Sequence, residues 1–290
     1  MRPYIKTYSV CVGNQACNAK CPFCVARMTG TAGVKPGASA CLDSFRLKRG
    51  AELAKSLGAT TVLITGKGEP TLWPDRLYDV LMELRGIMPL MEVQTNGIAL
   101  TDEMLDKMYG YGVTMVALSA VHCDNDANKK CYGENYPGLE RLIEMVHTKH
   151  MSVRICCMLC KGWIDTVGGV ERMIRLANGY DVEQLTIRSV QVPSQPSCRN
   201  PEVYRWAEEH KLSQEQVHEI EWHIHERSTR LNTLVHGHVY AYPLEGDKEQ
   251  NVCVSDCLTR DPDSNEIRQL IYCPDGHVRY DWEHDAAIVF

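Results

Sequence analysis

The sequence contains no long hydrophobic run and no export signal. Hydrophobic residues make up 44% of the 290 residues, but the longest apolar stretches are far shorter than the roughly 20 residues that cross a membrane. Residues 1–6 lead into a strand-like segment rather than into an apolar stretch with a small-residue cleavage site. We therefore expect a cytoplasmic protein that has no membrane partner.

The sequence also has no excess of positive charge. Lysine and arginine number 31 against 37 aspartate and glutamate residues, which gives a formal net charge of -6 at pH 7. Domains that bind a nucleic-acid backbone usually carry a basic surface, so this balance argues against a nucleic-acid partner. The chain is long enough for one large domain with an appendage or for two small domains.

Cysteine, in contrast, is abundant, with 14 residues. In a reducing compartment, clustered cysteines indicate metal binding or catalysis rather than disulfides. The isolated cysteines, such as Cys11, Cys123 and Cys131, are expected to be small buried hydrophobic residues. The clustered ones are therefore the candidates for chemistry.

Strand and helix patterns alternate along the first two-thirds of the chain. Apolar, β-branched stretches predict six strands, at residues 8–12, 60–65, 91–95, 113–119, 152–159 and 184–190. Helical spacing predicts five intervening helices, with a long loop before the fourth. This alternation predicts an α/β fold with parallel strands, whose functional loops follow the C-terminal ends of the strands. Periodicity alone leaves a doubly wound sheet and a barrel as alternatives.

The alternation stops at residues 193–196, which include two prolines. We therefore expect a core domain over residues 1–195 and a smaller C-terminal cap over residues 196–290. The cap should contain helices near residues 201–210 and 214–231, then an irregular stretch and a β-hairpin. The hairpin turn is predicted at Pro274-Asp275-Gly276.

Three cysteines follow the first predicted strand with spacings of three and two residues: Cys17, Cys21 and Cys24. A tight loop can bring three thiolates to one soft metal centre. A structural zinc site would need a distant fourth ligand, and this alternative stays open. A [4Fe–4S] cluster on three cysteines instead leaves one iron free to bind another molecule.

The cysteine loop, with Phe23 just before the last cysteine, resembles the radical S-adenosylmethionine (radical SAM) superfamily over about residues 5–192. The resemblance implies a partial (β/α)6 TIM-type barrel, in agreement with the six predicted strands. It also implies an oxygen-sensitive enzyme whose [4Fe–4S] cluster binds S-adenosylmethionine. Reductive cleavage, with flavodoxin or ferredoxin as the reductant, would then yield a 5'-deoxyadenosyl radical that abstracts a hydrogen atom.

Further motifs follow the next predicted strands, where the superfamily has its cosubstrate site. Gly66-Lys67-Gly68-Glu69-Pro70 resembles the GGEP motif, although Lys67 departs from it. Glycines let a backbone approach a ligand, and a carboxylate pairs with an ammonium group. The resemblance assigns cosubstrate contacts to Phe23, Gly66, Gly68, Glu69, Pro70, Thr95, Asn96 and Ser119. Taken alone, each glycine-containing motif also fits an ordinary turn, and Ser119 also fits a strand-end serine whose hydroxyl is hydrogen-bonded within the protein.

Residues 153–162 and 185–188 resemble the fifth and sixth strands of the MoaA-like branch of the superfamily. Cys156 shares a strand face with Met158 and Cys160, and it either donates a hydrogen atom or packs in the core. Arg188 points from the last strand and fits either an anionic substrate or a structural ion pair.

The C-terminal region holds three more cysteines, Cys253, Cys257 and Cys273, which we call the tail cysteines. They resemble the auxiliary-cluster ligands of a twitch or SPASM domain, so a second iron–sulfur cluster is one interpretation and unligated thiols the other. Asp281 stands where those domains have a cysteine. The absence of a terminal Gly-Gly argues against the molybdenum-cofactor cyclase.

These patterns predict a radical SAM enzyme that acts on a small substrate, with a nucleotide derivative as the candidate. The alternative is a maturase that modifies a peptide or protein side chain. A third hypothesis is a non-catalytic iron–sulfur electron carrier. The loop around Glu69 argues against this third hypothesis, since a carrier needs no cosubstrate site.

Overall fold

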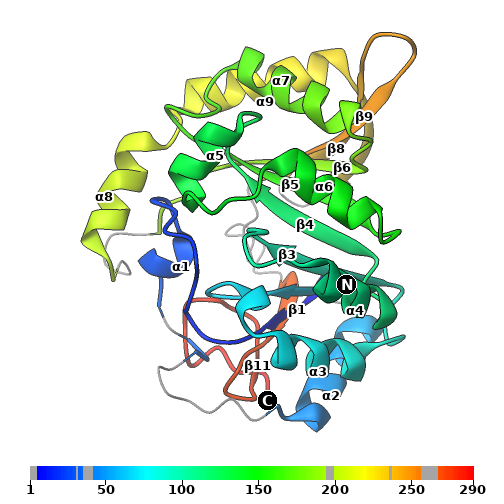
Figure 1. The fold of residues 1–290 in the computed structure, drawn as a ribbon. Coiled ribbons are helices and arrows are strands. Elements are labelled where there is room, and N and C mark those ends of the chain that lie inside the picture. Colours follow the sequence, from blue (N-terminus) through cyan, green and yellow to red (C-terminus); the bar gives the residue numbers. More distant parts are fainter. Residues whose placement is uncertain (1–4, 31, 35–41, 194–198, 235–236, 256–266) are drawn as a thin grey trace.

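A computed structural model describes residues 5–30, 32–34, 42–193, 199–234, 237–255 and 267–290. In this part of the chain, eleven strands form one sheet in the order β11-β10-β1-β2-β3-β4-β5-β6-β9-β8-β7 (Figure 1). Six of them are the strands predicted from the sequence: β1 (Thr7–Cys11), β2 (Thr61–Thr65), β3 (Leu90–Thr95), β4 (Met115–Ala120), β5 (Ser152–Leu159) and β6 (Gln184–Ser189). They pair in parallel, so the loops after their C-terminal ends share one edge of the sheet.

The five predicted helices connect these strands: α2 (Ser44–Ser56), α3 (Pro74–Leu84), α4 (Asp102–Gly110), α6 (Leu139–His147) and α7 (Val167–Gly179). The predicted α/β fold is therefore confirmed. Within the described residues, the strand order ends at β11 and β7, which do not pair with each other, so the sheet is open rather than a closed barrel.

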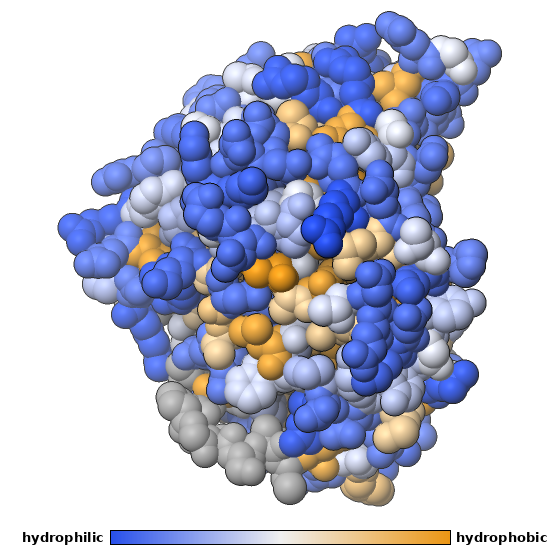
Figure 2. Space-filling model, in the orientation of Figure 1, coloured by the Kyte–Doolittle hydropathy of each residue, from blue (hydrophilic) through white to orange (hydrophobic). Residues whose placement is uncertain are grey.

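One face of the central strands is apolar and packs against the helices. Val93, Val116, Ile155 and Ile187 alternate onto this face, and each is at most 1% exposed. Burial of one such side chain contributes about 1.5–3 kcal/mol. Because successive strand side chains point to opposite faces, the residues between them line the inner face of the sheet. The outer surface in the view of Figure 2 is mostly hydrophilic.

Polar side chains define where the connecting helices begin. Asp43 accepts a hydrogen bond from the backbone N–H of Arg46 at the start of α2. Thr101 and Thr166 cap α4 and α7 in the same way. Each such cap contributes about 1 kcal/mol. Among the described helices, none is long and apolar enough to span a membrane.

Two segments differ from the sequence-based expectation. The expected long loop after β4 contains α5 (Asn125–Tyr132), because Asp124 accepts hydrogen bonds from two backbone N–H groups and caps it. The expected irregular stretch contains β7 (Thr229–Leu234), β8 (Gly237–Pro243) and β9 (Glu249–Ser255). In β7 no side chain is fully buried, so its sequence lacks the buried alternation that predicts a strand. Pairing with β8 stabilises it.

The C-terminal region extends the sheet at both ends. β9 pairs in parallel with β6, whereas β10 (Gln269–Tyr272) pairs in parallel with β1. The predicted hairpin is confirmed, since β10 is antiparallel to β11 (Val278–Arg279). α8 (Pro201–His210) and α9 (Gln214–Arg227) are also present. The expected boundary between residues 195 and 196 lies outside the described residues, and the two-domain division stays a prediction.

Candidate iron–sulfur and cosubstrate site

The three cysteines lie in the loop between β1 and α1 (Val25–Met28). Cys17 is exposed, and Cys21 and Cys24 are partly buried. The backbone N–H of Cys24 donates to the carbonyl of Cys21 at 3.2 Å, which makes the end of the loop a tight turn. Burial raises the pKa of the Cys17 and Cys24 thiols. The loop thus presents three thiols in one place, two of them held by the start of a helix.

The donor set consists of three thiols, and thiolates hold both iron–sulfur clusters and structural zinc. A structural zinc site would need a fourth protein ligand, whereas a [4Fe–4S] cluster on three cysteines keeps one iron open. Cys17, Cys21 and Cys24 fit the ligand set of such a cluster, in which each thiolate would bind a different iron.

The loop after β2 packs its backbone directly against the cysteine loop. A Cβ atom at Gly68 would lie 2.2 Å from the carbonyl oxygen of Ala16, so only glycine fits there. The next residue, Glu69, donates its backbone N–H to the same carbonyl at 2.9 Å. The sequence-predicted residues Gly68 and Glu69 are thus fixed beside the cysteines.

The carboxylate of Glu69 joins the loops after β2 and β3, and the side chain is only 3% exposed. Its Oε1 accepts hydrogen bonds from the Thr95 hydroxyl at 2.6 Å and from the Thr71 hydroxyl and N–H at 2.7 and 3.0 Å. Its Oε2 accepts one from the backbone N–H of Asn96 at 2.9 Å. Oε1 thus accepts three hydrogen bonds and Oε2 only one, so Oε2 is the oxygen that can accept a further donor.

Asn96 reaches from the loop after β3 to the cysteine loop. Its Nδ2 donates to the side-chain Oδ1 of Asn18 at 2.8 Å and to Cys17 Sγ at 3.7 Å. Its Oδ1 accepts from the N–H of Ile98 at 2.9 Å, which fixes the amide orientation. The cosubstrate contact predicted for Asn96 stays a prediction, and its side chain also contacts the proposed cluster ligand Cys17.

A comparison with known families decides the assignment. The family described as the Radical SAM superfamily matches residues 12–181. The chain belongs to this superfamily. Radical SAM proteins use a [4Fe–4S] cluster and S-adenosylmethionine, so the predicted cofactors are those of the family. No curated protein sequence matches the chain.

Solved structures share the radical SAM fold at low sequence identity. Streptococcus suis SuiB bound to S-adenosylmethionine has a TM-score of 0.64 and 12% identity, over 96% of this chain and 60% of SuiB. Native anSMEcpe with bound AdoMet has a TM-score of 0.58 and 13% identity, over 98% of this chain and 76% of that one. The chain thus spans about 60% of the length of SuiB.

The remaining predicted contacts of this radical SAM site lie on neighbouring elements. The Phe23 ring contacts Trp163 edge-on at 6.1 Å and Trp206 at 6.3 Å between centroids. Trp206 belongs to α8, which packs beside α1 (Figure 1). Ser119 lies near the end of β4 and is paired in register with Cys156. The rings of Phe23, Trp163 and Trp206, which we call the aromatic group, therefore lie on one side of the cysteine loop.

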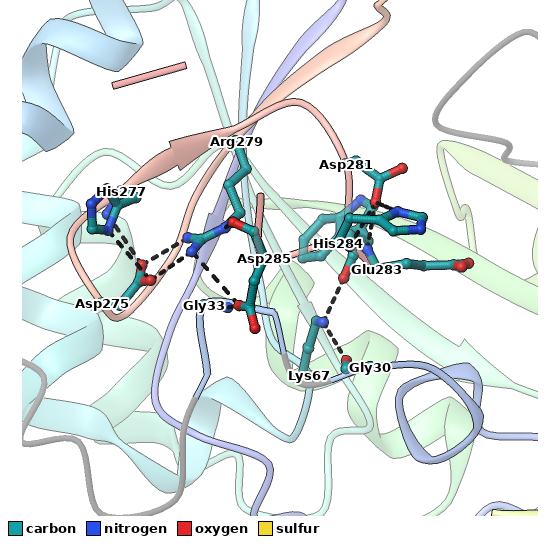
Figure 3. A network of polar contacts seen from close by, with 11 residues as sticks. Gly30, Gly33, Lys67, Asp275, His277, Arg279, Asp281, Glu283, His284 and Asp285 are labelled. Atoms are coloured by element: carbon teal, nitrogen blue, oxygen red, sulfur yellow. Dashed lines mark hydrogen bonds and ion pairs between the residues drawn. The ribbon is translucent and has the colours of Figure 1, made fainter. Parts of the chain in front are cut away.

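Lys67, the departure from the family motif, joins the loop after β2 to two segments that are distant in the sequence. Its side chain is 7% exposed, and Nζ donates to the carbonyls of Gly30 at 2.6 Å and Trp282 at 2.5 Å. Figure 3 shows Lys67 reaching between Gly30 and the segment that follows β11. Burial lowers the pKa of Lys67. Sequence reasoning missed this role, although a lysine between two loop glycines was the available signal.

The C-terminal segment around Lys67 is itself held by charged contacts (Figure 3). Arg279 donates to both carboxylate oxygens of Asp275, at 2.8 and 2.7 Å. Asp281 accepts the backbone N–H groups of Glu283 and His284, at 2.7 and 2.9 Å. Asp281, which stands where the sequence comparison with twitch and SPASM domains expects a cysteine, is thus a turn-forming carboxylate.

The tail cysteines are not brought together in the described residues. Cys253 lies in β9 beside Thr186, and Cys257 lies outside the described residues. Cys273 follows β10, where burial raises the pKa of its thiol to about 11 and Arg279 contacts it. Strands β1 to β6 separate β9 from β10 in the sheet. The auxiliary cluster stays a prediction.

One cysteine that sequence reasoning treated as inert lies at the site. Cys131 of α5 lies beside the thiol of Cys21 and lowers its pKa. The helix that carries Cys131 was expected to be a loop, so the contact had no signal in the sequence. α5 therefore supports the cysteine loop from the side of β4.

Proposed function

We propose that the protein is a radical SAM enzyme in which Cys17, Cys21 and Cys24 hold the [4Fe–4S] cluster. The bound cluster would supply the electron that cleaves S-adenosylmethionine to a 5'-deoxyadenosyl radical, which abstracts hydrogen from a small, nucleotide-like substrate. The observation that carries the proposal is the buried Glu69 carboxylate, which joins the loops after β2 and β3 beside the cysteine loop. A flavodoxin or ferredoxin would be the reductant.

The residues around Glu69 would bind and orient the cosubstrate. Oε2 of Glu69 can accept one more N–H, and the methionine ammonium group is a donor of suitable charge. The four fixed hydrogen bonds to the carboxylate hold it in place before the ligand arrives. The other assigned contacts are Phe23, Gly66, Gly68, Pro70, Thr95, Asn96 and Ser119.

The aromatic group around Phe23 would limit water access to the site. Its rings lie within 6.3 Å of one another, centroid to centroid. Met28 and Cys160 are fully buried against this group. An apolar wall beside the cysteine loop lowers the local dielectric and strengthens the contact between a carboxylate and a cation.

A second candidate function is the modification of a peptide or protein side chain. It rests on the likeness to Streptococcus suis SuiB bound to the precursor peptide SuiA, with a TM-score of 0.62 and 12% identity. A gene for a short precursor peptide beside the gene of this protein would favour it. The electron-carrier hypothesis is disfavoured, because a carrier has no use for the buried Glu69 arrangement.

The test is the affinity of the reconstituted protein for S-adenosylmethionine in a Glu69→Gln variant. A charge-assisted hydrogen bond contributes about 1.5–3 kcal/mol, so we expect affinity to fall roughly 10- to 150-fold. Glu52→Gln, on the exposed side of α2, is the matched control and should bind normally. Equal affinity in the Glu69 and Glu52 variants, at equal iron content, would refute the assigned role.

A further inference from the structure

The six central strands carry three charged residues, and all three lie on the inner face. Glu92 of β3, Arg154 of β5 and Arg188 of β6 are the charged residues within β1 to β6. Their neighbours Val93, Val153 and Ile187 point to the opposite, helix-covered face and are buried. The inner strand face therefore combines one carboxylate with two guanidinium groups.

Arg154 and Glu92 form an ion pair across the inner face of the sheet. Arg154 Nη1 lies 2.8 Å from Glu92 Oε2 and 2.9 Å from Oε1. Its Nε and Nη2 both donate to the side-chain oxygen of Gln184, at 2.9 and 2.7 Å. Burial raises the pKa of Glu92, while the two arginines oppose the rise. Glu92 therefore interacts with both arginines, and within β1 to β6 the two guanidinium groups outnumber the one carboxylate.

Arg188 lies at the end of the sheet where the cosubstrate residues lie. It is the fifth of the six residues of β6 and is in register with Met158 of β5. Thr95 and Ser119 occupy the same ends of β3 and β4. Arg188 is partly exposed. A guanidinium group has five N–H donors, so it can hold a ligand in addition to its protein contacts.

We propose that Arg188 binds an anionic group of the substrate, a carboxylate or a phosphate, on the inner face of the sheet. The inference rests on the proposed function and specifies its substrate class. The planar fork of arginine matches both anions in a bidentate contact. Because one carboxylate faces two guanidinium groups among the charged residues of β1 to β6, this face favours an anionic ligand.

The test is calorimetric binding of inorganic phosphate and of succinate to the reconstituted protein, with S-adenosylmethionine present and reductant absent. We expect saturable binding of at least one anion, and the better of the two identifies the group. Arg188→Gln should weaken this binding more than tenfold, and Arg188→Lys should weaken it less. Arg175→Gln removes an exposed arginine of α7 and should have no effect.

Absence of saturable binding by both anions, or binding that Arg188→Gln leaves intact, would overturn the assignment. Should the glutamine variant fail to retain iron, unchanged affinity in the lysine variant overturns it instead. Formation of 5'-deoxyadenosine by the wild-type protein, measured without added phosphate or succinate, separates the two proposals. Cleavage without anion binding contradicts the anion site alone, whereas no cleavage contradicts the proposed function.

Discussion

Replacing Lys67 with methionine should release the C-terminal segment from the core. The ammonium group donates to two backbone carbonyls, Gly30 and Trp282, in a site where the side chain is 7% exposed. Methionine has a similar length but no donor, so both carbonyls would lose their partner. Since both come from irregular segments, no strand or helix bond replaces the lost ones.

The magnitude follows from the contacts that are lost. Hydrogen bonds to a charged group contribute about 1.5–3 kcal/mol each, which gives roughly 3–6 kcal/mol for two. Removing a buried ammonium group also removes its desolvation penalty, and this offsets part of the loss. We therefore expect Lys67→Met to lower the free energy of unfolding by about 2–4 kcal/mol.

Urea titration and hydrogen exchange measure this prediction. Amides of residues 278–290 should exchange faster in Lys67→Met, because their anchor to the loop after β2 is gone. Lys48→Met is the matched control. Lys48 forms an ion pair with Glu83 at 2.5 Å but is 48% exposed, so its loss should change stability by less than about 1 kcal/mol. Equal effects of the two substitutions on stability and exchange would refute the anchoring role.

Three further outcomes are expected. Asn96→Leu removes the N–H group that donates to Cys17 Sγ. Such a donor stabilises the more negative reduced cluster, so its loss should lower the midpoint potential by roughly 20–40 mV in an electron-paramagnetic-resonance titration. An unchanged potential contradicts this prediction. Burial tends to raise the pKa of Asp275, but the hydrogen bonds and charge of Arg279 hold it below its usual 3.8. The ion pair is therefore fully present above that pH and lost as pH falls through the lower folded-state pKa, so Asp275→Asn should be about 2–3 kcal/mol less stable at neutral pH. In urea titrations, this difference should vanish in acid, and a constant difference argues against the pair. Alanine at all three tail cysteines should leave about four irons per chain in a colorimetric assay, whereas a loss of half the iron would show a second cluster.

The sequence predicts the parts of this protein that local patterns encode. Residues 61–65 read TVLIT, a β-branched run that has no helical alternative. The spacing of Cys17, Cys21 and Cys24 predicts a soft-metal loop, because three thiols within eight residues have few structural uses. The hairpin at residues 274–276 follows from its Pro-Asp-Gly turn.

The parts that the sequence does not predict depend on distant partners. Strand β7 has no buried alternation, and only pairing with β8 makes it a strand. Helix α5 begins at a cap, Asp124, within a polar segment that reads as a loop. The bond from Lys67 to Trp282 joins residues 215 positions apart, and nothing near Lys67 indicates its partner.

The most direct test of the central claim is anaerobic reconstitution followed by reaction with S-adenosylmethionine and dithionite. We predict a reducible [4Fe–4S] signal and formation of 5'-deoxyadenosine by the wild-type protein. A variant with alanine at Cys17, Cys21 and Cys24 should form no 5'-deoxyadenosine. Absence of both the signal and the product in the wild-type protein, or product formation by the alanine variant, would contradict the radical SAM account of this site.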